Sequence, residues 1–147
     1  MHKALTLGGA QITRIEDNLG PALEAKVMFP AFRDEIWEAE RHWLAPTYFT
    51  PDGMRLRTSI HSWLVRTGRH TVLIDSCIGN DKDMPHSPHF HLRDVPWLER
   101  LRASGAAAEQ IDFVMCTHLH ADHVGWNTRL RNGRWVPTFP NARYLFG

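Results

Sequence analysis

Three histidines and an aspartate lie within residues 118–123, and no other feature constrains the chain as much. The run reads His-Leu-His-Ala-Asp-His and directly follows residues 113–116, an apolar segment typical of a buried strand. Neutral imidazole and carboxylate groups are the usual ligands of zinc and similar divalent ions. A single histidine more often serves packing or lies at the surface, but three beside an aspartate after a strand indicate a metal site.

The spacing of these side chains predicts two adjacent ligand pairs. In an extended segment residues two apart point to the same side, so we expect His118 and His120 to bind one ion together. Asp122 and His123 come where the chain is expected to begin a helix, with Asp122 as its N-terminal residue and Gly125 shortly after. We therefore expect this pair to bind a second ion. Two ions about 3.5–4 Å apart can share an attacking water while one of them holds the substrate oxygen.

Residues 117–125 resemble the T-H-x-H-x-D-H-x-G signature of the metallo-β-lactamase-fold hydrolase superfamily, and every position of that signature matches. The superfamily includes lactonases, thioesterases, phosphotriesterases, β-lactamases, nucleases and some iron oxidoreductases, so the resemblance implies a fold more narrowly than a substrate. Residues 62–68, 72–81 and 125–128 look more like the subgroup of N-acyl-homoserine-lactone lactonases and methyl-parathion-hydrolase-like enzymes.

The resemblance also implies a role for each matching residue. His118 and His120 correspond to ligands of the first metal, and Asp122 and His123 to ligands of the second. The two divalent ions would be zinc, with manganese or iron as alternatives. Asp122 is the expected catalytic residue, because it could hold or pass a proton at the leaving group. Asp75 matches an aspartate that orients the ligands by hydrogen bonding, and the alternative is an aspartate that only shapes a turn.

The implied fold is α/β: the N-terminal half of an αββα sandwich, with a mixed sheet and helices on one face. The resemblance calls for a further histidine for each ion and a bridging aspartate from later in the chain, but no histidine follows His123. The sequence ends on the apolar run 143–147, where a natural terminus is more often polar. We therefore expect residues 1–147 to form one structural unit, half of a larger domain, with little turnover by itself.

Composition and charge narrow the function classes. With 17 basic and 16 acidic side chains the formal net charge is +1, which gives no electrostatic reason to expect nucleic acid or an anionic membrane as a partner. The sequence has no run of about 18 apolar residues and no signal-like start, so a cytoplasmic protein is expected. Cys77 and Cys116 are expected to be reduced thiols rather than a disulfide, and Cys116 a buried filler rather than a ligand.

Apolar alternation and turn residues predict the other elements of the sheet. The expected strands are residues 4–7, 11–15, 56–66 and 70–75, of which the last two form a hairpin. Residues 81–94 are rich in proline, histidine and charge, and we expect an exposed loop there rather than a second metal site. A helix over residues 95–105 then leads to the strand at 113–116, and this order indicates a parallel crossover.

One predicted helix has two interpretations. Phe32, Ile36, Ala39 and Trp43 recur at helical spacing after Pro30 and predict an amphipathic helix. We expect its apolar stripe to pack in the core. The alternative is a hydrophobic arm that covers the pocket or contacts a partner subunit.

Three functional hypotheses follow from the residues and the resemblance. The first is a two-metal hydrolase of a small-molecule lactone, ester or organophosphate, because a divalent ion lowers the pKa of bound water from about 15.7 to about 7. The second is an iron-dependent oxidoreductase of the same fold, similar to a sulfur dioxygenase. The third is a non-catalytic half-domain, whose uncovered sheet face and edge would favour a homodimer.

Overall fold

The computed structural model describes residues 4–147, and the chain divides into two units. The first unit extends up to Asp17 and resumes over Ile60–Gly147, and the second comprises Asn18–Ser59. The described residues contain no helix that is long and apolar enough to span a bilayer.

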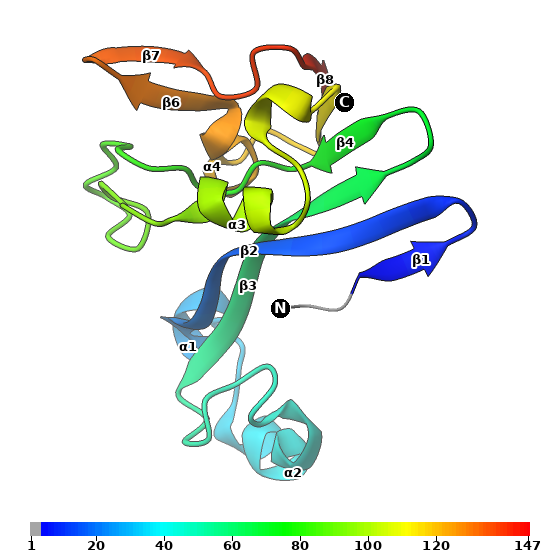
Figure 1. The fold of residues 1–147 in the computed structure, drawn as a ribbon. Coiled ribbons are helices and arrows are strands. Elements are labelled where there is room, and N and C mark those ends of the chain that lie inside the picture. Colours follow the sequence, from blue (N-terminus) through cyan, green and yellow to red (C-terminus); the bar gives the residue numbers. More distant parts are fainter. Residues whose placement is uncertain (1–3) are drawn as a thin grey trace. The chain divides into compact units, whose positions relative to one another are not determined.

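A six-stranded mixed sheet has the order β1-β2-β3-β4-β5-β8 (Figure 1). Its strands are β1 (Leu5–Leu7), β2 (Ala10–Glu24), β3 (Arg55–Arg66), β4 (Thr71–Ile74), β5 (Phe113–Cys116) and β8 (Arg143–Phe146). β1 pairs antiparallel with β2 and β3 with β4, whereas β4, β5 and β8 run parallel. The predicted α/β class with a mixed sheet is confirmed, as are the crossover from β4 to β5 and the strand at 113–116.

The hairpin between β3 and β4 forms where the sequence predicts it. Thr67 caps the turn: its backbone N–H donates to the carbonyl oxygen of His70 at 2.9 Å, and its hydroxyl oxygen accepts from the His70 N–H at 2.9 Å. A second, separate hairpin joins β6 (Thr128–Arg131) to β7 (Arg134–Pro137). The sequence analysis did not predict that hairpin.

The core of the first unit lies on one face of the sheet. Leu64, Leu73 and Val114 occupy the three central strands β3, β4 and β5, and each is fully buried. The helix α3 (Trp97–Ala103) packs against them. Its Trp97 and Leu101 lie one turn apart and are also fully buried. Burying a side chain of this size stabilises the fold by about 1.5–3 kcal/mol, so this layer fixes the ends of β4 and β5.

The opposite face of the same strands carries a row of apolar side chains. The register aligns Trp63 with Ile74, Ile74 with Met115, and Met115 with Leu145. Trp63, Met115 and Leu145 are 40%, 44% and 43% exposed. Successive strand residues point to opposite faces, so this row is the reverse side of the buried layer.

The second unit contains α1 (Ala25–Met28) and the predicted amphipathic helix, α2 (Asp34–Leu44). The rings of Phe32 and Trp37 each lie 5.6 Å from the buried ring of Phe49. α2 nevertheless has no buried residue, and Ile36 and Trp43 are 38% and 51% exposed. The prediction that this stripe packs in the core is therefore wrong: Trp37, outside the stripe, is the helix residue that lies against the buried Phe49, whereas Trp43 lies 6.0 Å from the exposed ring of Tyr48.

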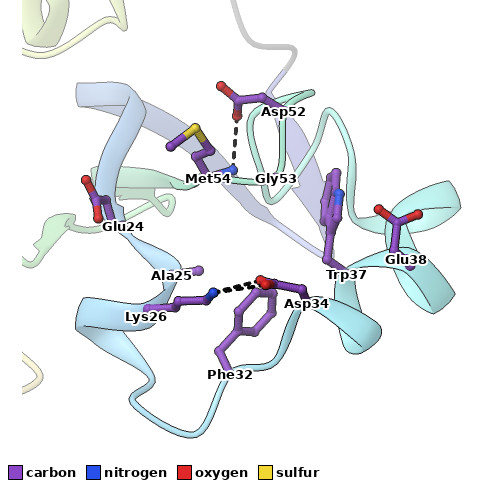
Figure 2. Close-up of a pocket in the computed structure, with 10 residues that line it drawn as sticks. All are labelled: Glu24, Ala25, Lys26, Phe32, Asp34, Trp37, Glu38, Asp52, Gly53 and Met54. Atoms are coloured by element: carbon purple, nitrogen blue, oxygen red, sulfur yellow. Dashed lines mark hydrogen bonds and ion pairs between the residues drawn. The ribbon is translucent and has the colours of Figure 1, made fainter.

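A hollow of about 380 Å³ lies within the second unit (Figure 2). Trp37, Phe32 and Met54 form apolar parts of its wall, and Lys26 pairs with Asp34 at 2.8 Å beside them. Its lining contains no histidine and none of the predicted metal ligands. This hollow is therefore not the predicted metal site.

Candidate metal centre

The predicted ligands follow the carboxyl end of β5. His118 and His120 lie in the non-helical segment after Cys116, and α4 (Ala121–Val124) starts directly after them. His120, with an extended backbone, occupies the N-cap position, so Asp122 is the second helical residue rather than the first. The helix begins one residue earlier than expected, and it is followed by a 3-10 turn, η2 (Gly125–Asn127).

The three imidazoles of the run lie together. The ring of His118 has its centroid 4.6 Å from that of His120 and 3.9 Å from that of His123. His118 Nε2 lies 3.1 Å from His120 Nδ1, and His123 Nε2 lies 3.6 Å from an Asp122 carboxylate oxygen. The structure thus brings together all four residues that the sequence predicts as ligands.

Asp75 connects these ligands at the end of β4. Its carboxylate accepts hydrogen bonds from the backbone N–H of Thr117 at 2.8 Å, from the Thr117 hydroxyl at 2.9 Å, and from His123 Nδ1 at 2.8 Å. Burial acts to raise the pKa of the Asp75 carboxyl group, but the hydrogen bonds from Thr117 and His123 lower it below its usual value. Asp75 is therefore ionised at neutral pH and acts only as an acceptor.

This acceptor determines which ring nitrogens carry protons. Because ionised Asp75 cannot donate, His123 Nδ1 must be the donor, and the neutral ring keeps its lone pair on Nε2. The Thr117 hydroxyl donates to Asp75, so its oxygen is left to accept from His118 Nδ1, 3.1 Å away. His118 then also keeps its lone pair on Nε2. One carboxylate thus prepares two imidazoles to bind a cation.

Backbone hydrogen bonds hold the ligand segment against the loop after β4. The Ser76 N–H donates to the carbonyl oxygen of His123 at 2.7 Å, and the Gly125 N–H donates to that of Cys77 at 2.7 Å. The Trp126 N–H donates to the carbonyl oxygen of Ser76 at 2.8 Å. These bonds fix the direction of α4 relative to the ends of β4 and β5.

The sequence analysis missed the polar residues behind the site. The Ser76 hydroxyl donates to the Asn127 side-chain oxygen at 2.9 Å, and the Asn127 amide nitrogen donates to Cys116 Sγ at 3.4 Å. Ser76 directly follows Asp75 and Asn127 lies two residues after Gly125, but nothing local in the sequence predicts that the two side chains meet. Trp126, beside these residues, is buried and stacks on Trp97, with the ring centroids 5.4 Å apart.

Both cysteines are free buried thiols, as expected. Burial raises the pKa of the Cys77 thiol well above its usual value, and Ser62 Oγ lies 3.1 Å from its sulfur. Burial also raises the pKa of Cys116, whose sulfur contacts Asn127. Both groups therefore stay protonated at neutral pH, and the structure favours packing over metal binding for Cys116.

The spacing of the predicted ligands suits two ligands on each divalent ion. Two nitrogens that bind one tetrahedral zinc at about 2.0–2.1 Å lie ~3.3 Å apart, and His118 Nε2 and His120 Nδ1 are 3.1 Å apart. Within residues 4–147 no three histidine, cysteine, aspartate or glutamate side chains converge on one ion position. The chain therefore fits two ligands on an ion better than a closed site of three or four.

The chain matches one family model and several solved structures. Residues 55–146 match the family model of the metallo-beta-lactamase superfamily. Among solved structures, a probable metal-dependent hydrolase from Staphylococcus aureus is 20% identical with a TM-score of 0.71, over 95% of this chain and 47% of that one. A comparison with curated proteins found no match.

Two further structures are similar. AidC, a dizinc quorum-quenching lactonase, is 22% identical with a TM-score of 0.70, over 97% of this chain and 43% of its own. AbOPH, a hydrolase in the beta-lactamase superfamily, is 29% identical with a TM-score of 0.68, over 96% and 42%. This chain spans less than half the length of each of the three structures. Since the family model covers most of the chain and includes the whole histidine run, the chain belongs to the metallo-beta-lactamase superfamily.

Proposed function

We propose that this chain supplies four metal ligands to a two-metal hydrolase of a lactone, ester or organophosphate. The observation that carries the proposal is the pairing of His118 with His120 and of Asp122 with His123, with Asp75 holding His123 Nδ1 at 2.8 Å. His118 and His120 would hold the first ion, and Asp122 and His123 the second. The remaining ligands would come from outside the part of the fold that this chain supplies.

The chemistry of the site depends on the ions and on the residues that present them. A bound divalent ion supplies hydroxide near neutral pH and polarises the substrate oxygen. Asp75 and Thr117 orient His118 and His123, so that the ligand nitrogens need little rearrangement. Asp122 has a partly exposed carboxylate, so one oxygen can face an ion while the other holds a proton for the leaving group.

The proposed substrate class is based on the similarity of this chain to other proteins. The runs at 62–68, 72–81 and 125–128 resemble lactonases and methyl-parathion-hydrolase-like enzymes, and AbOPH, at 29% identity, is described as a hydrolase. These observations favour hydrolysis of a small ester-like substrate over oxygen chemistry. Zinc is the proposed metal, because imidazole with carboxylate is a usual zinc donor set and because AidC is described as a dizinc lactonase.

The test is metal reconstitution of the full-length protein. We expect the zinc or manganese form to open an N-acyl-homoserine lactone or to cleave an aryl organophosphate, measured by proton release or by nitrophenolate absorbance. EDTA should abolish turnover and added zinc should restore it. Activity seen only with iron, together with oxygen uptake at an electrode and no hydrolysis, would replace the proposal with an oxidoreductase.

For the 147-residue chain by itself, we propose that a second copy covers the apolar row of Trp63, Ile74, Met115 and Leu145. These side chains form a continuous strip across four adjacent strands, and β8 lies at the edge of the sheet. Exposed strips and unpaired edges of this kind favour self-association.

Sedimentation velocity checks this homodimer with a matched pair of variants. We expect Met115→Glu to raise the dimer dissociation constant at least about tenfold, a change of about 1.4 kcal/mol, because it places a charge in the middle of the strip. Leu130→Glu is the control, since Leu130 lies on β6 with a similar exposure of 40%. A monomeric parent chain, or equal effects of both variants, would contradict the proposal.

A further inference from the structure

The loop that carries Asp75 has an unusual backbone. Asp75 and Cys77 adopt left-handed conformations with φ of 56° and 51°, and Gly79 has φ of 79°. A left-handed conformation is costly for a residue with a side chain, and it persists only where the surroundings hold it. The segment 75–79 therefore needs contacts that keep it in place.

Three consecutive residues of this loop contact the ligand segment. Asp75 binds His123 Nδ1, the Ser76 N–H binds the His123 carbonyl oxygen, and the Cys77 carbonyl oxygen accepts from the Gly125 N–H. Any shift of the loop would thus change the orientation of His123. The next residue, Ile78, uses its backbone N–H for a different partner, outside the ligand segment.

That N–H donates to a carboxylate from a distant part of the chain. Asp17, on β2, accepts it through Oδ2 at 3.0 Å, and the Asp17 side chain is completely buried. Arg93 donates to Asp17 Oδ1 at 3.1 Å and to its backbone oxygen at 3.3 Å. Arg100 donates to the same backbone oxygen at 3.2 Å.

Burying the Asp17–Arg93 ion pair costs desolvation free energy, which packing alone would not require. Burial raises the pKa of the Asp17 carboxyl group, against the lowering effects of the Ile78 N–H and of the charges on Arg93 and Arg100. An apolar residue would fill the same space without the desolvation cost of a buried ion pair. It could not, however, bind the Ile78 N–H and Arg93 at the same time, which is what fixes the far end of the loop.

We propose that Asp17, held by Arg93, is a positioning residue for the metal site: it fixes segment 75–79 and thereby the orientation of Asp75 and His123. The inference rests on the proposed function, because it gives His123 the role of a metal ligand. It goes beyond that function by assigning a role to an ion pair that contains no metal ligand and lies far from the histidine run in sequence.

The test compares Asp17→Asn with the parent full-length protein. The amide oxygen can still accept the Ile78 N–H, but the ion pair with Arg93 is lost. We expect the affinity for Co²⁺, followed by its visible absorption, to fall about tenfold, at the low end of the 10- to 100-fold typical of partners that orient metal ligands. In the metal-free protein the proton on His123 Nδ1 should exchange faster, seen as a broadened or lost downfield NMR resonance.

Two controls separate positioning from general destabilisation. Ile111→Ala removes a fully buried core side chain at the other end of β5. It should lower the unfolding temperature while leaving the Co²⁺ affinity of the folded protein and the His123 resonance unchanged. Arg93→Gln breaks the ion pair from the other side and should reproduce the effects of Asp17→Asn, which keeps the test decisive where one variant does not fold.

The outcomes distinguish this inference from the proposed function. A parent protein that binds no Co²⁺ would overturn the proposed function itself. A parent that binds Co²⁺, with Asp17→Asn and Arg93→Gln matching it in affinity and in the NMR signal, would overturn only the positioning role. Equal losses in Ile111→Ala would show that stability, rather than orientation, governs the affinity.

Discussion

Replacing Gly125 with alanine is expected to destabilise the fold by about 3 kcal/mol or more, at the upper end of the cost of overpacking. Gly125 has an ordinary helical backbone, so its conformation does not require glycine. The reason is contact: a Cβ at this position would overlap the carbonyl group of Ile78, and the Gly125 N–H binds the Cys77 carbonyl oxygen at 2.7 Å. Both neighbours are backbone atoms and cannot rotate away.

Urea unfolding measures this effect directly, with Gly68→Ala as the matched control. Gly68 lies in the turn between β3 and β4, and a Cβ there meets no atom within 4 Å. We expect this control to change the free energy of unfolding by less than about 1 kcal/mol. A Gly125→Ala variant as stable as the control would mean that the loop after β4 and the α4 segment do not pack as closely as described.

The same glycine shows what the sequence could predict and what it could not. Its place at the end of the T-H-x-H-x-D-H-x-G run marks it as part of the site, and local pattern also predicts the hairpin at Thr67, the strand at 113–116 and the helix over α2. These features depend on periodicity and turn chemistry, which neighbouring residues set. The close approach of Gly125 to Ile78 depends on two segments that are distant in sequence.

The hydrogen bonds behind the site that the sequence analysis missed are of this long-range kind, whereas the hairpin of β6 and β7, which it also missed, is local. Asp17 binds the Ile78 N–H across 61 positions, and Ser76 binds Asn127 across 51. Neither pair has a local signature, because each partner alone reads as an ordinary strand or loop residue. The prediction that the apolar stripe on α2 packs in the core was wrong for a related reason. Periodicity predicts that Ile36 and Trp43 share a side of the helix, but not what that side contacts.

The length of β2 shows that the sequence predicts where a strand lies better than where it ends. The sequence predicts a strand over residues 11–15, and the structure continues it to Glu24. Asp17, Asn18 and Gly20 interrupt the alternation that would have indicated the longer strand. In the structure β2 is hydrogen-bonded to β3, so contacts between strands, rather than local preference, determine its length.

Removing one imidazole of the first pair is expected to have the largest functional effect. His118→Ala or His120→Ala should weaken zinc binding by the full-length protein by at least about 100-fold, since even residues that only orient a metal ligand contribute 10- to 100-fold. Turnover should fall in parallel at limiting zinc. His89→Ala is the control, because His89 is an exposed histidine of the loop before α3.

Calorimetric titration of the double variant then tests whether the two rings bind one ion. His118 Nε2 and His120 Nδ1 lie 3.1 Å apart, so the second substitution should cost much less than the first once their common site is lost. Additive losses would place the two rings on different ions, and a loss in His89→Ala as large as in His118→Ala would remove the basis for the site. We expect a shared ion. Thr117, held by Asp75, binds His118 Nδ1, and the unprotonated Nε2 of His118 therefore faces His120 Nδ1.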